Sequence, residues 1–526
     1  MPFKSSFPDV EIPDASLYDY LFGSLTEEDL GRVAVTDGQT TLTYGELKGR
    51  IDAFAGGLAA RGVQPGDVVA MQVPNHPAFV VAFHGILRAG ATATTINSLY
   101  TPDEIAKQVK DSGAKQAVTV SLLLPGVVAG AEQAGLARED VIVLDGAEGH
   151  ASLVDLVSSG TPAPEVTIDP AEHLAVLPYS SGTTGNAKGV MLTHRNLVAN
   201  IAQCEPGLPL GDDDGILAVL PFFHIYGMNV IMNVSLRKRA KVVTMPKMDL
   251  EAFLQLTQDE KCTVLFIAPP IAVALAKHPM VDKFDLSSVR IVLSGAAPLD
   301  EALGNAVRDK FGCKIMQGYG MTELSPVTHL TPYDDDEMSV GSIGLPVPNV
   351  ECKVVDTDTG EEIAPVEGQR SAPGEMWVRG PMVMKGYLGN EAATSETIDG
   401  DGFLHTGDIV EVGERGEVYV VDRLKELIKY KGYQVPPAEL EALLLTHPKI
   451  ADSAVVAHPD EDGGEIPRAF VVPQQGEELT EQEVIEFVEA KVAPHKKVRL
   501  VDFIDAIPKS ASGKILRKDL RGLPRA

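Results

Sequence analysis

Short apolar runs alternate with helix-like segments through most of this 526-residue chain, and this alternation constrains the fold more than any other feature. Tyr44–Arg61 places apolar side chains at helical spacing, Gly62 can end that helix, and Val68–Val73 is an apolar run between turn signals. Helical patterns follow at Pro77–Ala89 and Thr101–Ser112. The later candidate strands are Leu174–Tyr179, Ile216–Leu220, Ala240–Met245, Val264–Ile267, Ile291–Ser294 and Lys314–Gln317. This alternation predicts an α/β fold of mostly parallel sheets covered by helices.

The pattern changes after about Gly341, where short strand patterns are separated by Gly, Asp and Pro. These candidate strands are Val350–Val355, Gly374–Arg379, Gly407–Val412 and Glu417–Val421. They predict a β-rich subdomain over about residues 341–422. Helix, strand, strand, helix and strand then follow at Val435–Thr446, Ala451–His458, Ala469–Val472, Thr480–Lys491 and Val498–Phe503. This order is typical of a small α+β unit.

The chain is too long for a single hydrophobic core, so several compact units are expected. We predict a large N-terminal domain over residues 1–422, which includes the β-rich subdomain. A C-terminal domain is predicted over residues 423–526. The boundary is placed in the charged stretch Asp422–Lys425, directly after a predicted strand.

The net charge of −29 predicts a surface that repels nucleic acid and anionic membranes. Basic side chains gather at the end of the chain, where residues Lys491–Ala526 contain ten Lys or Arg against three Asp. This basic tail would either solubilise the protein or serve a polyanionic small molecule.

The four cysteines are far apart in the sequence, which argues against a disulfide framework and against a zinc site. Asp9 and Glu11 precede any apolar run, so no signal peptide is predicted. The longest apolar stretch, around Ala78–Leu87, is too short to span a bilayer. We therefore expect a cytoplasmic protein, monomeric or homodimeric, without nucleic-acid partners or stable membrane insertion.

A glycine-rich segment, Tyr179–Gly189, follows an apolar run. Its glycines let the backbone approach a phosphate and turn N–H groups toward it. Hydroxyl donors, a glycine and one positive charge are supplied by Ser180, Ser181, Gly182, Thr183, Thr184 and Lys188. The segment is not a Walker A loop, because glycine rather than Ser or Thr follows the lysine. A flexible linker is the alternative, but the length of the string and its lysine favour a site for a nucleotide di- or triphosphate.

A second glycine turn, Gly318–Glu323, follows the predicted strand Lys314–Gln317. Two glycines can hold an aromatic ring against a flat ligand, and Thr322 can donate to a phosphate. The carboxylate of Glu323 can bind Mg²⁺, which prefers oxygen ligands. An ordinary turn is the alternative, and the missing third glycine excludes a Rossmann fingerprint.

Three further positions carry side chains suited to chemistry. Asp408 offers a carboxylate to which both hydroxyls of a ribose can donate, although a lone Asp is common in turns. Lys514 lies on a glycine-containing loop, Pro508–Ile515, that can move onto a phosphate or a carboxylate. His224 stands alone among aromatic residues, where a buried core histidine is the alternative.

Together these motifs resemble those of the adenylate-forming superfamily, which contains acyl-CoA synthetases, firefly luciferases and the adenylation domains of peptide synthetases. Within it, the chain looks most like 4-coumarate–CoA ligases and their bacterial relatives. The resemblance runs from about Thr41 to Leu520. It implies an ATP- and Mg²⁺-dependent carboxylic acid–CoA ligase. The acid and ATP would give acyl-AMP and pyrophosphate, and coenzyme A would then displace AMP.

The resemblance also implies a role for each motif residue in the nucleotide site. The glycine-rich segment binds phosphates, and Thr184 and Glu323 are Mg²⁺ ligands that also act in catalysis. Thr322 contacts the α-phosphate, and Asp408 and Arg423 bind the ribose. The adenine side is formed by Gly295, Ala296, Ala297, Pro298, Gln317, Gly318, Tyr319, Gly320 and Met321.

For the C-terminal domain, the resemblance implies a hinge at Lys425 and a rotation between the two half-reactions. Lys514 matches the lysine of the adenylation step. Lys429 and Gln434 match residues of the thioester step. The implied coenzyme A contacts are Lys431, Gly432 and, more weakly, Lys247.

The acid pocket implied by the resemblance is lined by His224, Tyr226, Gly295, Gly318, Gly320, Pro326 and Val327. Amino-acid-activating relatives place an Asp near His224, and Phe222–Gly227 contains none, which argues against an amino-acid substrate. Phe223–Tyr226 is more similar to hydroxycinnamate ligases than to fatty-acid ligases. The expected substrate is a hydroxycinnamate-type aromatic acid or a fatty acid.

Three other functions remain open for the sequence. An acyl-AMP ligase could load a carrier protein instead of coenzyme A, although Lys247, Lys431 and Gly432 favour coenzyme A. A luciferase-like oxygenase could oxidise the adenylate, but the C-terminal Leu523–Ala526 is not a peroxisomal address. A non-catalytic nucleotide-binding relative is disfavoured by the intact set Lys188, Glu323, Asp408 and Lys514.

Replacing Lys514 with Ala should separate the two half-reactions. Acyl-AMP formation should fall by about two to three orders of magnitude, because a preorganised charge at the transition state is lost. The variant should still convert supplied acyl-AMP into thioester, as single-turnover assays of each step would show. Equal loss in both steps would refute this division of roles.

Overall fold

The computed structural model describes residues 3–181, 187–364, 368–431, 433–460, 464–510 and 513–524. The chain divides into two compact units. The large unit comprises Lys4–Glu351 and Arg379–Leu404, and the small unit comprises Met1–Phe3, Cys352–Val378 and His405–Ala526. The small unit therefore holds most of the β-rich segment together with the C-terminal residues, and the domain boundary at residue 422 stays a prediction.

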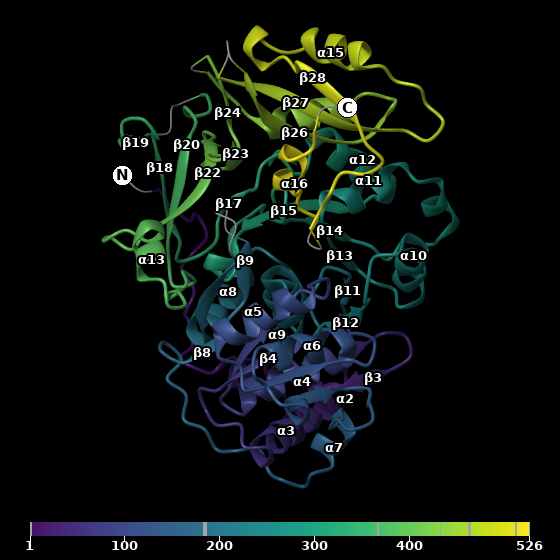
Figure 1. The fold of residues 1–526 in the computed structure, drawn as a ribbon, viewed down its shortest axis with the longest axis vertical. Helices are drawn as coiled ribbons and strands as arrows, with labels where there is room; N and C mark the ends of the chain where they lie inside the picture. The colour runs from purple at the N-terminus through teal and green to yellow at the C-terminus, as the bar shows by residue number, and fades with distance from the viewer. Residues whose placement is uncertain are drawn as a thin grey trace. The chain divides into compact units, whose positions relative to one another are not determined.

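The first sheet of the large unit is built mostly of parallel strands (Figure 1). Its order is β3 (Thr41–Thr43), β2 (Val33–Thr36), β12 (Lys241–Thr244), β11 (Gly215–Ala218), β13 (Val264–Ile267), β14 (Ile291–Ser294), β15 (Lys314–Gly320), β16 (Val327–Leu330) and β17 (Leu345–Pro346). Neighbours from β2 to β15 are parallel, and the strands at both edges are antiparallel. The crossover helices are α10 (Leu250–Asp259), α11 (Pro269–Lys277) and α12 (Glu301–Phe311). The predicted α/β fold is confirmed.

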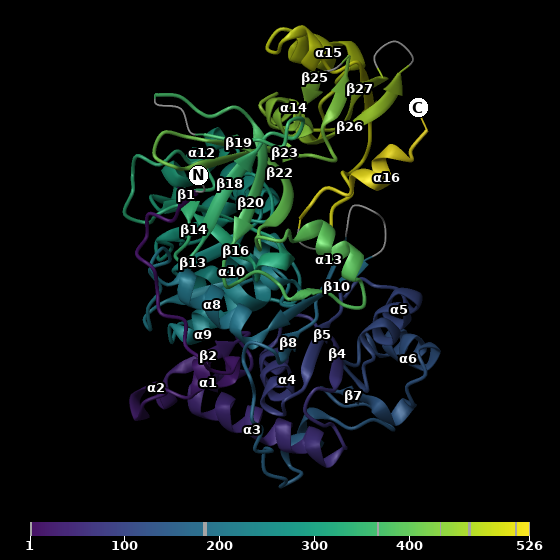
Figure 2. The same cartoon turned by 90° about the vertical axis from the view of Figure 1, so that its left-hand side faces the viewer.

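A second sheet of the large unit carries the glycine-rich segment. Its order is β7 (Val141–Val143), β6 (Gln116–Thr119), β4 (Val68–Gln72), β5 (Thr92–Thr95), β8 (Leu174–Val176), β10 (Ala187–Thr193) and β21 (Gly386–Tyr387), with β9 (Tyr179–Ser181) on β10. Its helices include α3 (Tyr44–Ala60), α4 (Pro77–Arg88), α5 (Pro102–Ser112) and α6 (Leu124–Gln133). Helices α5 and α6 lie beside this part of the sheet (Figure 2). Their apolar side chains, among them Ile105, Val109 and Val127, pack against β4, β6 and β7.

The predicted strands Val264–Ile267 and Ile291–Ser294 match β13 and β14, because both are apolar runs buried on both faces. The predicted strand Leu174–Tyr179 is wrong as one element, since it divides into β8 and β9. The periodic segment Val190–Asn200 also divides, into the end of β10 and the start of α8 (His194–Cys204). Thr193 makes this division by capping α8, since its hydroxyl accepts from the amide of Asn196.

The small unit contains two further groups of strands. One runs β18 (Glu351–Val355), β20 (Gly374–Arg379), β22 (Leu404–Val412) and β23 (Val418–Arg423). The other runs β25 (Tyr433–Val435), β24 (Ile428–Tyr430), β27 (Gly464–Pro473) and β26 (Ile450–Asp460), with β28 (Leu500–Phe503) parallel to β27. Its helices are α14 (Pro437–Leu445), α15 (Glu481–Glu489) and α16 (Arg517–Arg521).

The predicted α+β order of the C-terminal region is present, with one hairpin added. Sequence analysis missed β24 and β25, because their three-residue strands carry polar side chains and resemble a linker. The helix predicted from Val435 begins at Pro437 instead, since Val435 pairs with Ile428 in that hairpin. The carboxylate of Asp422 accepts the amide of Ala438 in the first turn of α14 at 2.9 Å.

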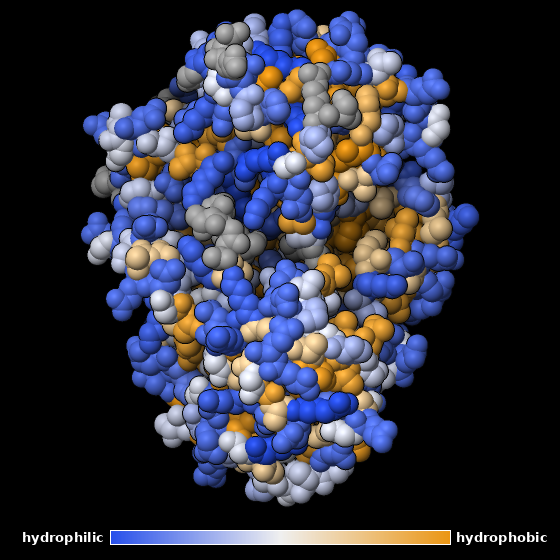
Figure 3. Space-filling model, in the orientation of Figure 1, coloured by the Kyte–Doolittle hydropathy of each residue, from blue (hydrophilic) through white to orange (hydrophobic). Residues whose placement is uncertain are grey.

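Much of the basic tail is balanced by carboxylates of the same unit. The ion pairs are Lys496–Glu439, Lys497–Glu489, Lys509–Asp452, Arg517–Glu441 and Arg521–Glu426. These side chains therefore do not form one open cationic surface for a polyanion. Polar side chains cover most of the face shown in Figure 3. Within the described ranges, no helix is long and apolar enough to cross a membrane.

A buried ion pair fixes β27 to β28 in the small unit. Arg468 donates to Asp502 at 2.6 Å, and both side chains are buried. Its remaining N–H groups donate to the carbonyls of Leu523 and Pro524 at 2.9 and 3.1 Å. A guanidinium can be buried here because acceptors surround it.

Replacing Asp502 with Ala should destabilise the protein by about 3 kcal/mol, because Arg468 would remain buried without its carboxylate. Thermal unfolding of the full-length protein should show a lower midpoint. Asp505→Ala is the matched control, since Asp505 is exposed three residues further along and its loss should change stability by less than about 0.5 kcal/mol. Equal midpoints for both variants would contradict this role of the pair.

Candidate active site

The described parts of the glycine-rich segment are strand β9 and the start of β10. These strands are antiparallel, and Ser180 lies opposite Lys188 in their register. Residues 182–186, with the predicted ligands Gly182, Thr183 and Thr184, lie outside the described residues, as does the side chain of Ser181. The paired strands therefore place one hydroxyl and one lysine opposite each other.

The carboxylate of Glu323 lies beside these strands and is only 5% exposed. Two hydroxyls donate to its Oε1 atom, that of Ser180 at 2.9 Å and that of Tyr387 at 2.9 Å. The ammonium of Lys188 lies 4.6 Å from the ring centroid of the same tyrosine. The structure thus brings together three predicted residues, Ser180, Lys188 and Glu323.

Tyr387 is a member of this cluster that sequence analysis missed. It lies on β21, opposite Val190 of β10, and its amide donates to Thr394. Burial and the neighbouring Glu323 raise the pKa of its hydroxyl, so the phenol stays protonated and donates at neutral pH. The sequence gives little sign of this, because Tyr387 is 64 positions from Glu323.

The environment of Glu323 fits a metal ion that arrives with a nucleotide. No cation pairs with this buried carboxylate among the described residues, and a buried charge needs compensation. Mg²⁺ usually binds one or two carboxylates together with substrate phosphates and water. No cluster of three His, Cys, Asp or Glu that could hold a metal alone occurs in the described part of the chain.

The two predicted adenine-side segments lie on neighbouring parallel strands. Ser294 of β14 is paired with Gln317 of β15, so Gly295–Pro298 leaves β14 beside the last part of β15. The turn predicted to begin at Gly318 is wrong in its first half, because Gly318–Gly320 continue β15 and pair with β16. The side chain of Gln317 links the two segments within the protein. Its Oε1 accepts from the amide of Leu299 at 3.0 Å, and its Nε2 donates to the carbonyl of Val340. The nucleotide contact predicted for Gln317 therefore stays a prediction, beside this structural role.

Gly320 faces the backbone of the predicted acid pocket. A Cβ atom there would lie 2.1 Å from the carbonyl oxygen of Pro326, so only glycine fits.

Two buried asparagines hold the backbone of this segment. Asn200 exchanges two hydrogen bonds with the backbone of Val327, at 2.7 and 3.1 Å, and Asn229 donates to the carbonyl of Ser325 at 2.7 Å. Both asparagines are fully buried and were missed in the sequence. Their only sequence signal is an amide inside an apolar segment.

Tyr226 and His224 stand at the start of a π-helix, η2 (Tyr226–Val234). A Cβ on Gly295 would lie 3.0 Å from the ring of Tyr226, so these two predicted pocket residues are in contact. Burial raises the pKa of Tyr226, and its hydroxyl donates to the carbonyl of Leu293 at 3.4 Å. His224 is half-buried, and its Nδ1 accepts from the amide of Tyr226 at 3.3 Å. His224 is therefore not a fully buried core histidine.

In the small unit, Asp408 and Arg423 form an ion pair across β22 and β23, with Nε 3.3 Å from Oδ1. Asp408 is 6% exposed, whereas half of the arginine side chain is exposed. The turn expected before Asp408 is wrong, because Gly407 lies within β22. Glu375, which sequence analysis missed, accepts from the amide of Gly407 at 2.9 Å. Its other oxygen accepts from the indole of Trp377 at 2.9 Å. The two predicted ribose ligands are therefore adjacent and held in place.

The predicted thioester residues Lys429 and Gln434 lie opposite each other in the β24–β25 hairpin, and both side chains are exposed. The predicted coenzyme A contact Lys431 is exposed at the turn of this hairpin, and Gly432 lies outside the described residues. Lys425 and Lys247 are also exposed. The structure therefore pairs two of these residues and leaves their roles as predictions.

Lys514 is joined to Ser510 by two hydrogen bonds. Its amide donates to the Ser510 hydroxyl at 3.1 Å, and its carbonyl accepts from the Ser510 amide at 2.8 Å. Helix α16 follows, where Arg517 donates twice to the buried Glu441, at 2.8 and 2.7 Å. Burial raises the pKa of Glu441, and Arg517 opposes that shift. The segment that follows Lys514 is thereby tied to the core of the small unit.

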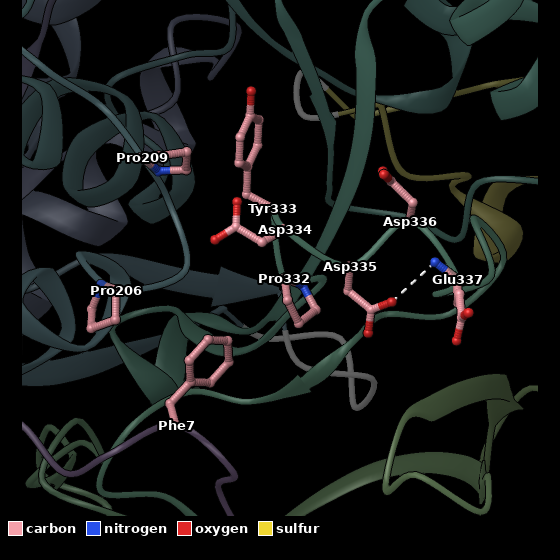
Figure 4. A pocket seen from close by; sticks show the side chains of 9 residues that line it. All are labelled: Phe7, Pro206, Pro209, Pro332, Tyr333, Asp334, Asp335, Asp336 and Glu337. Carbon is pink, nitrogen blue, oxygen red and sulfur yellow. Dashed lines mark hydrogen bonds between the residues drawn. The ribbon is translucent and has the colours of Figure 1, made fainter.

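The large unit also has a surface pocket whose lining includes none of the predicted site residues (Figure 4). It is lined by Phe7, Pro206, Pro209, Pro332, Tyr333, Asp334, Asp335, Asp336 and Glu337. Four adjacent acidic residues would repel a polyphosphate. This pocket is therefore not a candidate nucleotide site.

Comparison with known proteins agrees with the predicted resemblance. Residues 25–388 match the family model of AMP-binding enzymes, and residues 439–514 match that of the AMP-binding enzyme C-terminal domain. The chain belongs to the AMP-binding enzyme family. The predicted ATP-dependent acid–thiol ligase activity agrees with this family and with the names of its relatives.

Two plant relatives of this AMP-binding enzyme are similar over nearly their whole length. It is 45% identical to 4-coumarate–CoA ligase 5 of Oryza sativa subsp. japonica, over 99% of this chain and 96% of the relative. It is also 45% identical to 4-coumarate–CoA ligase 2 of Nicotiana tabacum, over 99% and 98%. ATP-bound MatB from Rhodopseudomonas palustris superposes with a TM-score of 0.87 at 32% identity, over 97% of this chain and 98% of MatB.

Trp377 is the single tryptophan of the chain, so intrinsic fluorescence should report on the part of β22 that carries Asp408. AMP should change its emission saturably, because Glu375 joins the indole to Gly407. Asp408→Ala should raise the midpoint of this AMP titration roughly tenfold or more, since hydrogen bonds to a charged group are lost. An unchanged midpoint in the variant would exclude Asp408 as a ribose ligand.

Proposed function

We propose that the protein joins a hydroxycinnamate-type aromatic acid to coenzyme A through an acyl-AMP intermediate. The observation that carries this proposal is the 45% identity to named 4-coumarate–CoA ligases over 99% of the chain. Identity over the full length covers both the nucleotide-binding motifs and the C-terminal residues of the thioester step. Coenzyme A is therefore favoured over a carrier protein as the acceptor.

In the first half-reaction, a carboxylate oxygen of the acid attacks the α-phosphorus of ATP. A C–O–P anhydride forms, and the bond to the leaving pyrophosphate breaks. Negative charge grows on the phosphates, and we assign its stabilisation to Lys188 and Lys514; bound Mg²⁺ would supply further positive charge. We assign Glu323 to Mg²⁺, because it is a buried carboxylate without a described cationic partner.

In the second half-reaction, the thiol of coenzyme A loses its proton and attacks the acyl carbonyl. A C–S bond forms, the C–O bond of the anhydride breaks, and AMP leaves with its electron pair. We assign Lys429 and Gln434 to this step, since their opposed positions put two exposed polar side chains on one hairpin. The predicted hinge at Lys425 and a mobile domain over residues 423–526 would serve the exchange between steps.

The preference for an aromatic acid rests on the relatives rather than on space at the glycines. The Cβ direction of Gly320 is filled by the carbonyl of Pro326, and that of Gly295 by the buried ring of Tyr226. A fatty acid is the second candidate. A cytoplasmic location and a monomeric or homodimeric state belong to the same proposal.

A pyrophosphate-release screen tests the acid. With ATP, Mg²⁺ and coenzyme A, 4-coumarate and related cinnamates should give kcat/KM at least about tenfold above benzoates and medium-chain fatty acids, since shape mismatch in an apolar pocket costs about 1–3 kcal/mol. Reactions without coenzyme A should stop after the first turnover. Activity confined to amino acids or to fatty acids would overturn the assignment.

A further inference from the structure

The starting observation is how the carboxylate of Glu323 is held. Both of its described hydrogen bonds end on Oε1, one from Ser180 and one from Tyr387. Among the described residues, no side chain donates to Oε2. A carboxylate held on one oxygen has a defined orientation and keeps the lone pairs of the other for a further ligand.

The second observation is that the aromatic ring of Tyr387 contacts Lys188, the lysine of the glycine-rich segment. The ring lies below the ammonium of Lys188 at 4.6 Å, whereas the hydroxyl reaches Glu323 at 2.9 Å. A protonated lysine is attracted to the face of an aromatic ring. One side chain therefore contacts both the predicted metal ligand and the predicted phosphate ligand.

The third observation concerns how Tyr387 itself is fixed. Strand β21 pairs with β10 through Val190 and Met191, directly after the glycine-rich segment. The amide of Tyr387 donates to the Thr394 hydroxyl at 2.9 Å, and the side chain is only 7% exposed. The tyrosine is thus attached to the same strand that carries Lys188.

We propose that Tyr387 is a positioning residue of the adenylation step: its hydroxyl orients Glu323 for the metal–nucleotide complex, and its ring orients Lys188 for the phosphates. The proposal rests on the function proposed above. The two contacts can be removed separately. Phenylalanine at position 387 keeps the ring but loses the hydroxyl, whereas leucine loses both. Tyr387 need not touch the substrate to act in this way.

The test measures ATP binding to the full-length protein by calorimetric titration, without acid, over a range of Mg²⁺ concentrations and in EDTA. Tyr387→Phe should raise the Mg²⁺ concentration for half-maximal ATP affinity roughly tenfold, because a hydrogen bond to a charged group is lost. Its ATP affinity in EDTA should remain that of the unaltered protein, since Lys188 keeps its ring. Tyr387→Leu should weaken ATP binding in both conditions.

Tyr20 provides the matched control. Its hydroxyl donates to Glu205 at 2.8 Å, and the guanidinium of Arg237 lies 4.3 Å from its ring centroid. Tyr20→Phe therefore also removes a tyrosine–glutamate hydrogen bond beside a cation, here partly buried, at a place with no predicted ligand. It should leave ATP affinity unchanged at every Mg²⁺ concentration.

The possible outcomes separate the two proposals. A Mg²⁺ shift in Tyr387→Phe alone supports the positioning role. Equal affinities of Tyr387→Phe and the unaltered protein, equal losses with and without Mg²⁺, or the same shift in Tyr20→Phe would each overturn it. Failure of the unaltered protein to bind ATP would instead reject the proposed function.

Discussion

Parallel pairing of β14 with β15 is the constraint on which the candidate site depends. Both strands are buried in the middle of the sheet, and parallel strands deliver their carboxyl ends to one edge. Ser294 and Gln317 are partners in this register, so the segments that follow them must begin as neighbours. A shift by one residue would move Gln317 to the opposite face and separate it from Leu299. The position of the candidate site is therefore set by apolar strands whose side chains have no predicted catalytic or binding role.

The sequence was sufficient for the features that depend on local pattern. Strands such as β13 and β14 are apolar runs bounded by turn residues, and they were predicted without error in their bounds. The motif residues Ser180, Lys188 and Glu323 were found because glycine turns and charged side chains are visible in a string. Their meeting in the structure agrees with the implied nucleotide site.

The rest could not be predicted, because it depends on contacts between distant segments. Asn200 reaches Val327 across 127 positions, and Glu375 reaches Gly407 across 32. Neither contact leaves a periodic signal. Residue type also left the internal role of Gln317 invisible, since its amide bonds the protein's own backbone beside the contact that was predicted for it. The β24–β25 hairpin was missed because it has the composition of a linker.

The two glycines of the predicted acid pocket differ in how they oppose a side chain. At Gly320 the obstacle is a backbone carbonyl 2.1 Å away, which cannot move without displacing the Pro326 segment that Asn200 and Asn229 hold. At Gly295 the obstacle is the tyrosine ring at 3.0 Å, a side chain that can rotate. We therefore expect a side chain at position 295 to be tolerated when residue 226 becomes smaller, whereas position 320 accepts only glycine. If these residues line the acid pocket, its volume can be redistributed between positions 295 and 226 but not at position 320.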